Sequence, residues 1–453
     1  LNGTYDYTDQ NGYPYGLYDA ETKEVAGVDY DYPSSYYREI VTVGFNANYV
    51  GEKISFNSQS SFQSINDDQK IDQDFSPTSL WYVHQTSEQR LFSQELTIKS
   101  TTDSKYQHIT GLFAFSQENS KYVNPSYLQS DMELHQHSDT PTMGIALYHQ
   151  SSYQISDSFT ALAGIRLDSE FAGQDYKAYM NALSSTDNKV ETSSFENFQN
   201  FSQLTPKFTL KYEYNPNSMF YGSITRGYKA GGFNTIFETE ADYSYDPEYN
   251  WNYEIGTKQS FLDGKLTADL ALFYIDWRDQ QVGITISGVG NVMRNAARSL
   301  SRGAEFSLTA RPIQNVNITA SYGFTDAKYL EYENNGIDYS DNYLILVPRH
   351  TASLQASYTF YDLAPSLKRL MFSAGITGAG KIYWDDANKY SQNFYTVMNA
   401  KISAQIKNNF TLELWAKNLY NTDYVTYMFT MSTNQFAQRG KPTSLGCSLI
   451  YKF

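Results

Sequence analysis

The stretch Phe410-Thr-Leu-Glu-Leu-Trp-Ala-Lys417 alternates between apolar and polar side chains with a period of two residues. Charge is confined to one parity, which carries Glu413 and Lys417. The other parity is apolar and comprises Phe410, Leu412, Leu414 and Ala416. Successive side chains of a β-strand point to opposite faces of a sheet. The stretch therefore predicts a β-strand with one apolar and one wet face.

The same alternation continues on both sides of this stretch. Toward the C-terminus, a second set of apolar positions alternates with Gly446, Ser448, Ile450 and Lys452, and comprises Leu445, Cys447, Leu449, Tyr451 and Phe453. Toward the N-terminus, equivalent segments occupy residues 396–406, 370–376, 352–360, 316–324 and 304–310. Repeated segments of this kind place the chain in the all-β class.

The connections between these segments alternate between short and long. Short turns rich in Gly, Asn, Asp and Pro are expected at residues 51–53, 101–104, 155–158, 215–217, 262–265, 312–315, 362–367 and 407–409. Long loops are expected between them, at residues 64–86, 118–141, 171–201, 230–249, 280–299, 328–347, 383–393 and 421–441. Outer-membrane barrels have short turns on one side and long loops on the other. The alternation therefore favours a transmembrane antiparallel β-barrel over a soluble sandwich.

The number of strands also fits a barrel. About 17 strands follow from Arg38 onward, and Leu1–Asp9 could be part of one more, which gives about 18. An even number is usual for bacterial barrels.

Composition is compatible with this fold class. The chain has 41 Tyr and 27 Phe among its 453 residues, yet only 41% of its residues are hydrophobic. The mean hydropathy is -0.53. No stretch approaches the roughly 18 consecutive apolar residues that a membrane-spanning helix needs. A barrel keeps its mean hydropathy low because only every second residue faces lipid.

Charge and cysteine content exclude some further classes. The formal net charge of -15 argues against a nucleic-acid or anionic-lipid partner, since both select basic patches. The single cysteine, Cys447, excludes an internal disulfide. Leu1 is not followed by a charged and then apolar leader, so we expect that a signal peptide has been removed or lies upstream.

Several segments between about Ile54 and Phe453 resemble, in order, the TonB-dependent receptors that import iron–siderophore complexes. They comprise Ser93-Gln-Glu-Leu96, Gly164-Ile-Arg166, Thr205-Pro-Lys-Phe208, Arg226-Gly-Tyr-Lys-Ala-Gly-Gly-Phe-Asn234, Tyr253-Glu-Ile-Gly-Thr-Lys258, Phe273-Tyr-Ile-Asp-Trp277, Asn418-Leu-Tyr-Asn421 and Gly440-Lys-Pro442 through Tyr451-Lys-Phe453. The run from Tyr228 to Asn234 is similar to that of receptors of the yersiniabactin and pesticin type.

The resemblance implies a protein of the Gram-negative outer membrane that binds a ferric siderophore or a similar metal chelate. Import would draw on the TonB–ExbB–ExbD motor of the inner membrane, acting through an N-terminal plug, and the wall would contact outer-membrane lipid and lipopolysaccharide. The resemblance implies no enzymatic activity and no cofactor. A passive outer-membrane channel or a surface-binding barrel without TonB coupling is the alternative.

The family's plug and energy-coupling box do not occur in these residues, and its barrels have about 22 strands. We therefore expect residues 1–453 to be the barrel domain, with the plug and about four strands upstream. An open edge in lipid would leave backbone groups unpaired at several kcal/mol each.

Five residues are candidates for the ligand site: Arg226, Tyr228, Lys229, Asn234 and Trp384. The run that contains the first four leaves a strand through paired glycines, which permit positive φ and close backbone approach. Trp384 lies in a second segment at the extracellular end of a strand. Cations and aromatic rings suit a chelate that presents negative charge and ring faces. The alternative is that these residues only brace the bases of the loops.

Other residues have side chains suited to ligand or metal binding. Loop aromatics that could stack on a siderophore, or form the girdle at the lipid boundary, are Trp81, Tyr82, Tyr122, Tyr127, Tyr243, Tyr245, Tyr383, Trp384, Tyr424 and Tyr427. His135 and His137, beside Asp131 and Glu133, could bind a transition metal or be solvated. The acidic run at 67–74 could hold calcium, but it lacks the glycine of a calcium loop. No Gly-x-Ser-x-Gly elbow occurs, and we find no nucleophile site.

The alternation of turns and loops predicts an orientation in the membrane. The long connections at 171–201 and 230–249 should face the cell exterior, because both lie opposite short turns. Protease added to intact cells is expected to cut within these two segments and to spare residues 215–217. Cleavage at 215–217 in intact cells would reverse the orientation.

Overall fold

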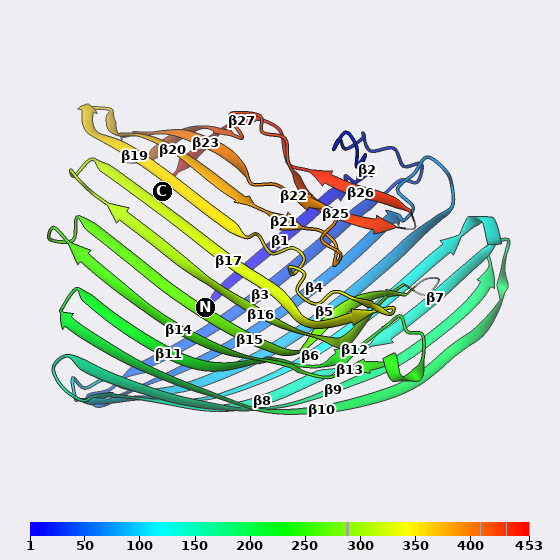
Figure 1. Cartoon of the computed structure of the whole chain (residues 1–453), viewed down its shortest axis with the longest axis horizontal. Coiled ribbons are helices and arrows are strands. Elements are labelled where there is room, and N and C mark those ends of the chain that lie inside the picture. Colours follow the sequence, from blue (N-terminus) through cyan, green and yellow to red (C-terminus); the bar gives the residue numbers. More distant parts are fainter. Residues whose placement is uncertain (287–289, 408, 432, 453) are drawn as a thin grey trace.

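One antiparallel sheet of 20 strands curls round on itself and forms the wall of a barrel (Figure 1). The structure is a computed structural model that describes residues 1–286, 290–407, 409–431 and 433–452. Two of the 20 strands, β7 (Met132–Asp139) and β18 (Ile337–Asp338), are short additions, so 18 strands of the described residues span the wall. These are β1 (Asn2–Asn11), β3 (Ser35–Val50), β4 (Ile54–Asp72), β5 (Trp81–Ser100), β6 (Tyr106–Tyr127), β8 (Thr142–Gln154), β9 (Phe159–Ala182), β10 (Ser185–Asn215), β11 (Ser218–Lys229), β14 (Glu248–Phe261), β15 (Leu266–Ile286), β16 (Gly290–Ala310), β17 (Val316–Asn334), β19 (His350–Ala364), β20 (Leu367–Gly380), β23 (Tyr395–Ile406), β24 (Phe410–Lys417) and β27 (Ser444–Tyr451). The prediction of an all-β barrel with about 18 strands is confirmed.

Each wall strand pairs with the next one in chain order, from β1 with β3 to β24 with β27. β8 pairs with the first parts of β6 and β9, and β7 pairs with their later parts, so β7 and β8 occupy one interrupted position in the wall. Within the described residues, the pairing registers end at β1 on one side and at β27 on the other. The wall is therefore a curved sheet with two edges.

The short turns lie where the sequence predicts them. The connection between β8 and β9 covers residues 155–158, and that between β14 and β15 covers residues 262–265. The second turn is tight: Leu262 and Asp263 have φ values of 54° and 55°, and Gly264 has a φ of 81°. The turn at 407–409 includes residue 408, which lies outside the described residues, as does Phe453 at the chain end.

The prediction of long irregular loops was partly wrong, because most of these segments prolong the wall strands. β4 continues to Asp72 and β5 begins at Trp81, so only residues 73–80 of the predicted loop at 64–86 lie outside the two strands. β9 and β10 meet at residues 183–184, inside the predicted loop at 171–201. Cross-strand pairs of polar and aromatic side chains stabilise strands without apolar alternation. The ring of Tyr122, for example, stacks on that of His137 with centroids 4.0 Å apart.

Short elements complete the mouth of the barrel. They are β2 (Gly16–Leu17), η1 (Leu128–Ser130), β12 (Gly232–Phe233), η2 (Glu240–Asp242), β13 (Ser244–Tyr245), β21 (Ile382–Tyr383), β22 (Ser391–Gln392), β25 (Val425–Met431) and β26 (Asn434–Arg439). β2, from the segment between β1 and β3, pairs with β26. Among the described residues, no helix has the length and apolar character needed to cross a membrane.

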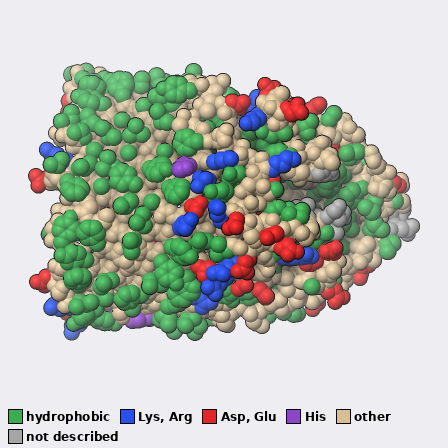
Figure 2. Space-filling model, in the orientation of Figure 1, with side chains coloured by type: hydrophobic (Ala, Val, Ile, Leu, Met, Phe, Trp, Pro, Cys, Tyr) green, Lys and Arg blue, Asp and Glu red, His purple; other side chains and the backbone are tan. Residues whose placement is uncertain are grey.

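The outer face of the wall is apolar over much of its height. Leu445 is 74% exposed and Leu449 is 70% exposed, whereas the Glu413 side chain is only 19% exposed and its carboxylate accepts a hydrogen bond from Lys401 at 3.0 Å. Figure 2 shows hydrophobic side chains covering the left part of the visible face, with charged groups gathered to the right and at the left rim. Such a large exposed apolar surface fits contact with lipid, as the alternation of the strands predicts.

The two parities of β24 should therefore differ in their contact with lipid. Spin labels introduced singly at Leu412 and Leu414, in a Cys447→Ser background, are expected to be reached by a lipid-phase quencher, because both side chains face outward. Labels at Glu413 and Lys417 serve as the matched controls and should be reached by a water-soluble quencher instead. The reverse result would show that the register is shifted by one residue.

Candidate functional site

A cavity of about 520 Å³ lies inside the mouth of the barrel. Its walls come from the inner face of β5, β6, β7, β9 and β10, from the start of β16, and from the connections between β4 and β5 and between β11 and β14. The lining residues are aromatic, aliphatic or neutral polar, and comprise Gln73, Trp81, Val83, Gln85, Val123, Pro125, Tyr127, Leu134, Gln136, Tyr176, Ala178, Thr192, Ser193, Thr235, Ile236, Phe237 and Asn291. None of these residues carries a formal charge, so the cavity offers ring faces and amide groups rather than an ion-pairing partner.

Stacked rings form two sides of this cavity. Trp81 and Tyr127 stack with ring centroids 5.4 Å apart and planes 6° apart. On the other side, Tyr176 and Phe237 meet edge to face at 5.5 Å. The Nε2 amide group of Gln136 donates a hydrogen bond to the Tyr176 hydroxyl at 2.9 Å. The contact between Tyr176 and Phe237 holds the segment that follows β11 against the inner wall.

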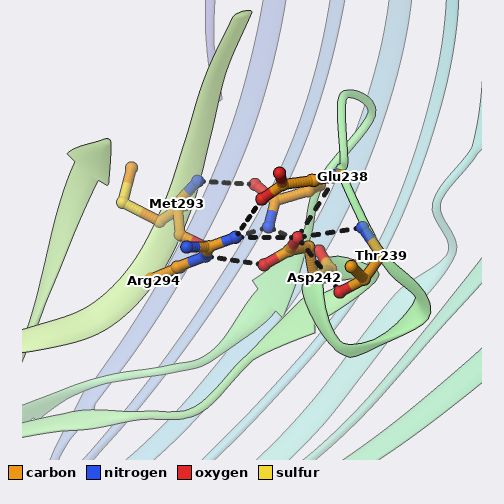
Figure 3. Close-up of polar contacts among 6 residues, drawn as sticks. Glu238, Thr239, Asp242, Met293 and Arg294 are labelled. Carbon is orange, nitrogen blue, oxygen red and sulfur yellow. Dashed lines mark hydrogen bonds and ion pairs between the residues drawn. The ribbon is translucent and has the colours of Figure 1, made fainter. Parts of the chain in front are cut away.

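A polar network anchors the same segment to β16 (Figure 3). The Arg294 guanidinium donates to both carboxylate oxygens of Asp242, with Nε 2.6 Å and Nη2 2.9 Å from the oxygens that they contact. One of these oxygens also accepts the backbone N–H groups of Glu238 at 3.2 Å and Thr239 at 3.1 Å. The hydrogen bonds from Arg294 lower the pKa of Asp242 to about 2. The carboxylate therefore stays charged at neutral pH, and the segment is held by charge-assisted hydrogen bonds.

Asn234, one of the five predicted site residues, belongs to this anchor. Its Nδ2 group donates to the carbonyl oxygens of Asp242 at 2.7 Å and Met293 at 2.9 Å. Its Oδ1 atom accepts the Met293 N–H at 2.9 Å. The side chain is thus fully engaged within the protein, which is the arrangement expected of a residue that braces a loop.

The paired glycines of the predicted site are needed for close approach. A Cβ atom at Gly231 would lie 2.3 Å from the carbonyl oxygen of Tyr245, and a Cβ atom at Gly232 would lie 2.5 Å from the hydroxyl of Tyr245. Among the described glycines, positive φ occurs at Gly264, Gly336 and Gly380 and not at this pair. The glycines therefore let the chain pack closely on itself, and the left-handed conformation is not used here.

The other members of the same run occupy the end of β11. Lys229 has 61% of its side chain exposed, and its Nζ atom lies 4.0 Å from a carboxylate oxygen of Glu248. The register between β10 and β11 ends at Lys207 and Thr225. Arg226 follows this point, where its Nη1 group donates to the Leu204 carbonyl at 3.1 Å and its guanidinium lies 4.8 Å from the Tyr249 ring centroid. Tyr228 is half-buried and lies opposite Tyr249.

Trp384 lies in a different part of the mouth. It is 8% exposed and packs in a cluster with Val25, Met428 and Ala437. Its indole N–H is buried without a hydrogen-bond partner in the structure. Nearby Asp386 accepts hydrogen bonds from the hydroxyl groups of Tyr329 at 3.2 Å and Tyr332 at 3.1 Å, and burial raises the pKa of its carboxyl group. The structure thus places Arg226, Tyr228 and Lys229 near the end of one strand, with Lys229 on the opposite parity from the other two. It places Asn234 and Trp384 in two separate packed regions.

The polar lining of the cavity was missed in the sequence. Trp81 and Tyr127 were named as ring candidates, whereas Gln85, Gln136 and Asn291 were not. Gln85 and Gln136 share the inward parity with Val83 and Leu134. Extending the alternation past the predicted strand ends would have found these two residues. Asn291 comes from a distant strand, and no local signal marks it.

The weaker candidates have local partners. The Nε2 atom of His135 lies 2.6 Å from Asn181 Oδ1, and no group of three or more His, Cys, Asp or Glu that could hold a metal ion is found among the described residues. Within the acidic run at 67–74, the Asp67 carboxylate accepts hydrogen bonds from Arg38 at 2.6 and 2.9 Å. The Asp72 carboxylate accepts the backbone N–H of Phe75 at 3.0 Å. The acidic side chains of this run therefore stabilise the pairing of neighbouring strands and a turn.

The family described as TonB dependent receptor-like, beta-barrel, matches residues 1–419. This chain belongs to the TonB-dependent receptor family. Its similarity to the crystal structure of the ferric yersiniabactin uptake receptor FyuA from Yersinia pestis has a TM-score of 0.85 at 18% identity, and covers 100% of this chain and 67% of that one. For the siderophore receptor PiuA from Acinetobacter baumannii the TM-score is 0.74 at 16% identity, covering 100% of this chain and 71% of that one.

Relatives in sequence are receptors as well. The metal-pseudopaline receptor of Pseudomonas aeruginosa is 23% identical over 310 residues, which are 68% of this chain and 41% of that protein. The pesticin receptor of Yersinia enterocolitica is 22% identical over 316 residues, 68% of this chain and 44% of that protein. The chain thus spans less than half the length of these two relatives. The resemblance predicted from sequence is confirmed, and the family places this TonB-dependent receptor barrel in the outer membrane of a Gram-negative bacterium. The family consists of receptors rather than enzymes.

The hydrogen bonds between Asp242 and Arg294 should keep residues 234–243 ordered. In Asp242→Asn, amide hydrogen exchange across residues 234–243 should become about tenfold to a hundredfold faster, because a charge-assisted hydrogen bond is worth roughly 1.5–3 kcal/mol. The matched control is Glu238→Gln, whose carboxylate is half-exposed and 3.4 Å from Arg294, and it should change exchange little. Equal exchange in all three proteins would contradict the anchor.

The pH dependence of the anchor follows from the lowered pKa of Asp242. A carboxyl group with a folded-state pKa below its ordinary 3.8 stabilises the folded state above that ordinary value. The stabilisation is then lost as the pH falls toward about 2. Protection of residues 234–243, corrected for intrinsic exchange, should therefore be unchanged between neutral pH and about pH 5, and fall below about pH 4.

Proposed function

We propose that this receptor barrel captures a metal chelate of the ferric-siderophore type at the cell surface, and that the chelate is then imported with TonB-coupled energy. The observation that carries the proposal is the uncharged, ring-lined cavity of about 520 Å³ inside the mouth. Its size suits a small-molecule ligand. The names of the related proteins support the class of ligand, since they include receptors for metal-pseudopaline and for ferric yersiniabactin.

The chemistry of the cavity favours a chelate of low net charge over a polyanion. Trp81, Tyr127 and Phe237 present ring faces, and Gln85 and Gln136 present amide groups. A polyanion placed here would lose its hydration without gaining a cationic partner among the lining residues. A chelate whose charges are cancelled around the metal, with rings or methylenes on its outer surface, would lose much less hydration energy.

We propose that the predicted site residues act around this cavity in two ways. Lys229 lies where the connection between β11 and β14 begins, and its exposed ammonium group provides one positive charge for contact with the ligand. Arg226 and Tyr228 shape the wall beside it. Asn234 and Trp384 hold the loops in place, because both are buried in packed contacts. The ligand itself would touch the cavity walls and Lys229.

Active import needs a moving part inside the lumen. We propose that the full-length receptor has a plug and further wall strands, which correspond to the portion of the related receptors that this chain does not span. The further strands would pair with the edges at β1 and β27. The physical support is the cost of a free edge, since each unpaired backbone group in lipid costs several kcal/mol. The motor would act through that plug.

Substitution of the cavity wall tests the proposal. Trp81→Ala and Lys229→Ala in the complete receptor should each weaken binding of a neutral ferric hydroxamate such as ferrichrome about tenfold. The Trp81 ring would cover apolar surface of the ligand, and the Lys229 ammonium group would donate a hydrogen bond to hydroxamate oxygens, each worth on the order of 1.5 kcal/mol. Tyr361→Ala, at an exposed ring near a short turn, is the control and should leave binding unchanged. Affinity would be measured by titration after surface expression has been confirmed.

The outcomes separate the roles assigned to the residues. Trp384→Ala should lower thermal stability, by up to about 3–5 kcal/mol in unfolding free energy, with a smaller effect on affinity. Ferric citrate, as an anionic probe, should bind more weakly than ferrichrome. Preferential binding of ferric citrate would overturn the low-charge assignment, and uptake that persists without the motor would favour a passive channel.

A further inference from the structure

Two tyrosine side chains of β17 donate hydrogen bonds to one carboxylate at the mouth of the barrel. The hydroxyl of Tyr329 lies 3.2 Å from Oδ1 of Asp386, and the hydroxyl of Tyr332 lies 3.1 Å from Oδ2. Asp386 belongs to the connection between β20 and β23, so the three side chains come from two distant parts of the chain. None of them lines the ring-lined cavity. They form a separate oxygen cluster.

The oxygen cluster is buried and acidic. Tyr329 and Tyr332 are each 3% exposed, whereas Asp386 is half-buried and keeps part of its surface open to solvent. The two donors to its carboxylate are neutral phenols, and the charge that acts on it comes from Asp385, which is also an acid. A buried charge is normally paired or coordinates a metal ion. The two phenols supply no such counter-charge.

Asn334 adds a further oxygen beside Tyr332. Its Nδ2 group lies 3.5 Å from the Tyr332 hydroxyl, and its Oδ1 atom is buried without a hydrogen-bond partner among the described residues. A buried acceptor left unpaired is costly, and a bound ion is one of the partners that can satisfy it. Turning the amide over exchanges its two ends, which brings Oδ1 to the side of the phenol without any change in the backbone.

Two loops hold the carboxylate in place. The Nδ2 group of Asn342, in the connection between β17 and β19, donates to the backbone carbonyl oxygen of Asp386 at 2.8 Å. Asn388 joins the same two loops, because its Oδ1 accepts the Tyr343 N–H at 2.7 Å and its Nδ2 donates to the Tyr343 carbonyl at 2.9 Å. The two tyrosines of β17 pack in a buried cluster with Leu344. The oxygen atoms are therefore positioned before any ligand arrives.

We propose that this oxygen cluster, together with Asn334, binds a ferric ion directly and without its chelate. Hard oxygen ligands suit a small, highly charged cation. Small octahedral cations hold oxygen at about 2.0–2.1 Å, which places neighbouring ligand oxygens about 2.9 Å apart. The two pairs of phenol and carboxylate oxygens already lie 3.2 and 3.1 Å apart. An ion can thus take the place of the two phenol protons with little movement.

Charge balance selects a trivalent ion. Burial raises the pKa of both phenol groups, so neither ionises by itself at neutral pH. A coordinated cation displaces such protons. Two phenolates and one carboxylate then carry three negative charges, which Fe³⁺ cancels, whereas a divalent ion would leave one negative charge buried and unpaired. Binding releases two protons to water and leaves the oxidation state of the iron unchanged.

Titration of the complete receptor with iron in detergent tests the site. Ferric nitrilotriacetate supplies the ion without a siderophore, so the result does not depend on the ring-lined cavity. The wild type should gain the visible charge-transfer absorption of Fe³⁺ bound to phenolate, which the donor complex lacks. Tyr329→Phe and Tyr332→Phe keep the rings and should each weaken this absorption, and the double variant should abolish it. The matched control is Tyr15→Phe, at a mouth tyrosine that packs against Phe75 and Phe429, and it should retain the absorption.

Asp386→Asn keeps the shape of the side chain but removes its charge, and should weaken iron binding at least about tenfold, since loss of even an outer partner of a metal ligand costs that much. A cooperative thermal transition in each variant would show that it is folded. Absence of the absorption in the wild type, its persistence in the folded double variant, or its equal loss in Tyr15→Phe would overturn the proposal. Binding of Zn²⁺ as tight as that of Ga³⁺, a redox-inert trivalent ion, would overturn the trivalent assignment.

Discussion

A strand that crosses lipid must form hydrogen bonds from its backbone N–H and C=O groups to neighbouring strands, because no water is present to bond to them. The rest of this structure depends on that constraint. It makes a hydrogen-bonded sheet the only wall that strands can build, and it forces consecutive strands to pair, as β3 does with β4 over sixteen residue pairs. Once the backbone is paired in a sheet, successive side chains point alternately to the lipid and to the lumen. The apolar parity of Leu412 and Leu414 and the polar parity of Glu413 are the direct result.

That constraint explains which parts of the fold could be predicted from the sequence. Parity and tight turns are local, so the strands and the turn at 262–265 were predictable from neighbouring residues alone. The length of the strands above the membrane could not be predicted in this way, because there the sheet is held by pairs between residues far apart in sequence, such as Arg38 with Asp67. Polar residues on both faces look like a loop when each strand is considered singly. They form a ladder only once the partner strand is in place.

The candidate site was less predictable for the same reason. The run from Arg226 to Asn234 was visible as a motif, yet its glycines and Asn234 serve contacts within the protein, while the cavity is lined largely by residues that no motif marks. Asn291 and Gln85 meet in one cavity from strands far apart in sequence. A cavity is a property of the folded wall and its covering segment. Only rings, which were conspicuous by type, could be named beforehand.

The net charge of the whole chain does not describe the charge at any one contact, because the sheet sorts charges by face. A total of -15 is compatible with local arrays such as that of Asp276, whose carboxylate lies 2.8 Å from Arg278 and 3.2 Å from Arg298. The long-range field of the whole chain is screened within about 8–10 Å at physiological salt, whereas hydrogen-bonding groups act at contact. A bound anion therefore responds to the local array. The same argument applies inside the mouth, where none of the residues that line the cavity carries a formal charge. The residues that touch a ligand therefore decide what is bound, and the alternation that separates lipid from lumen decides which residues those are.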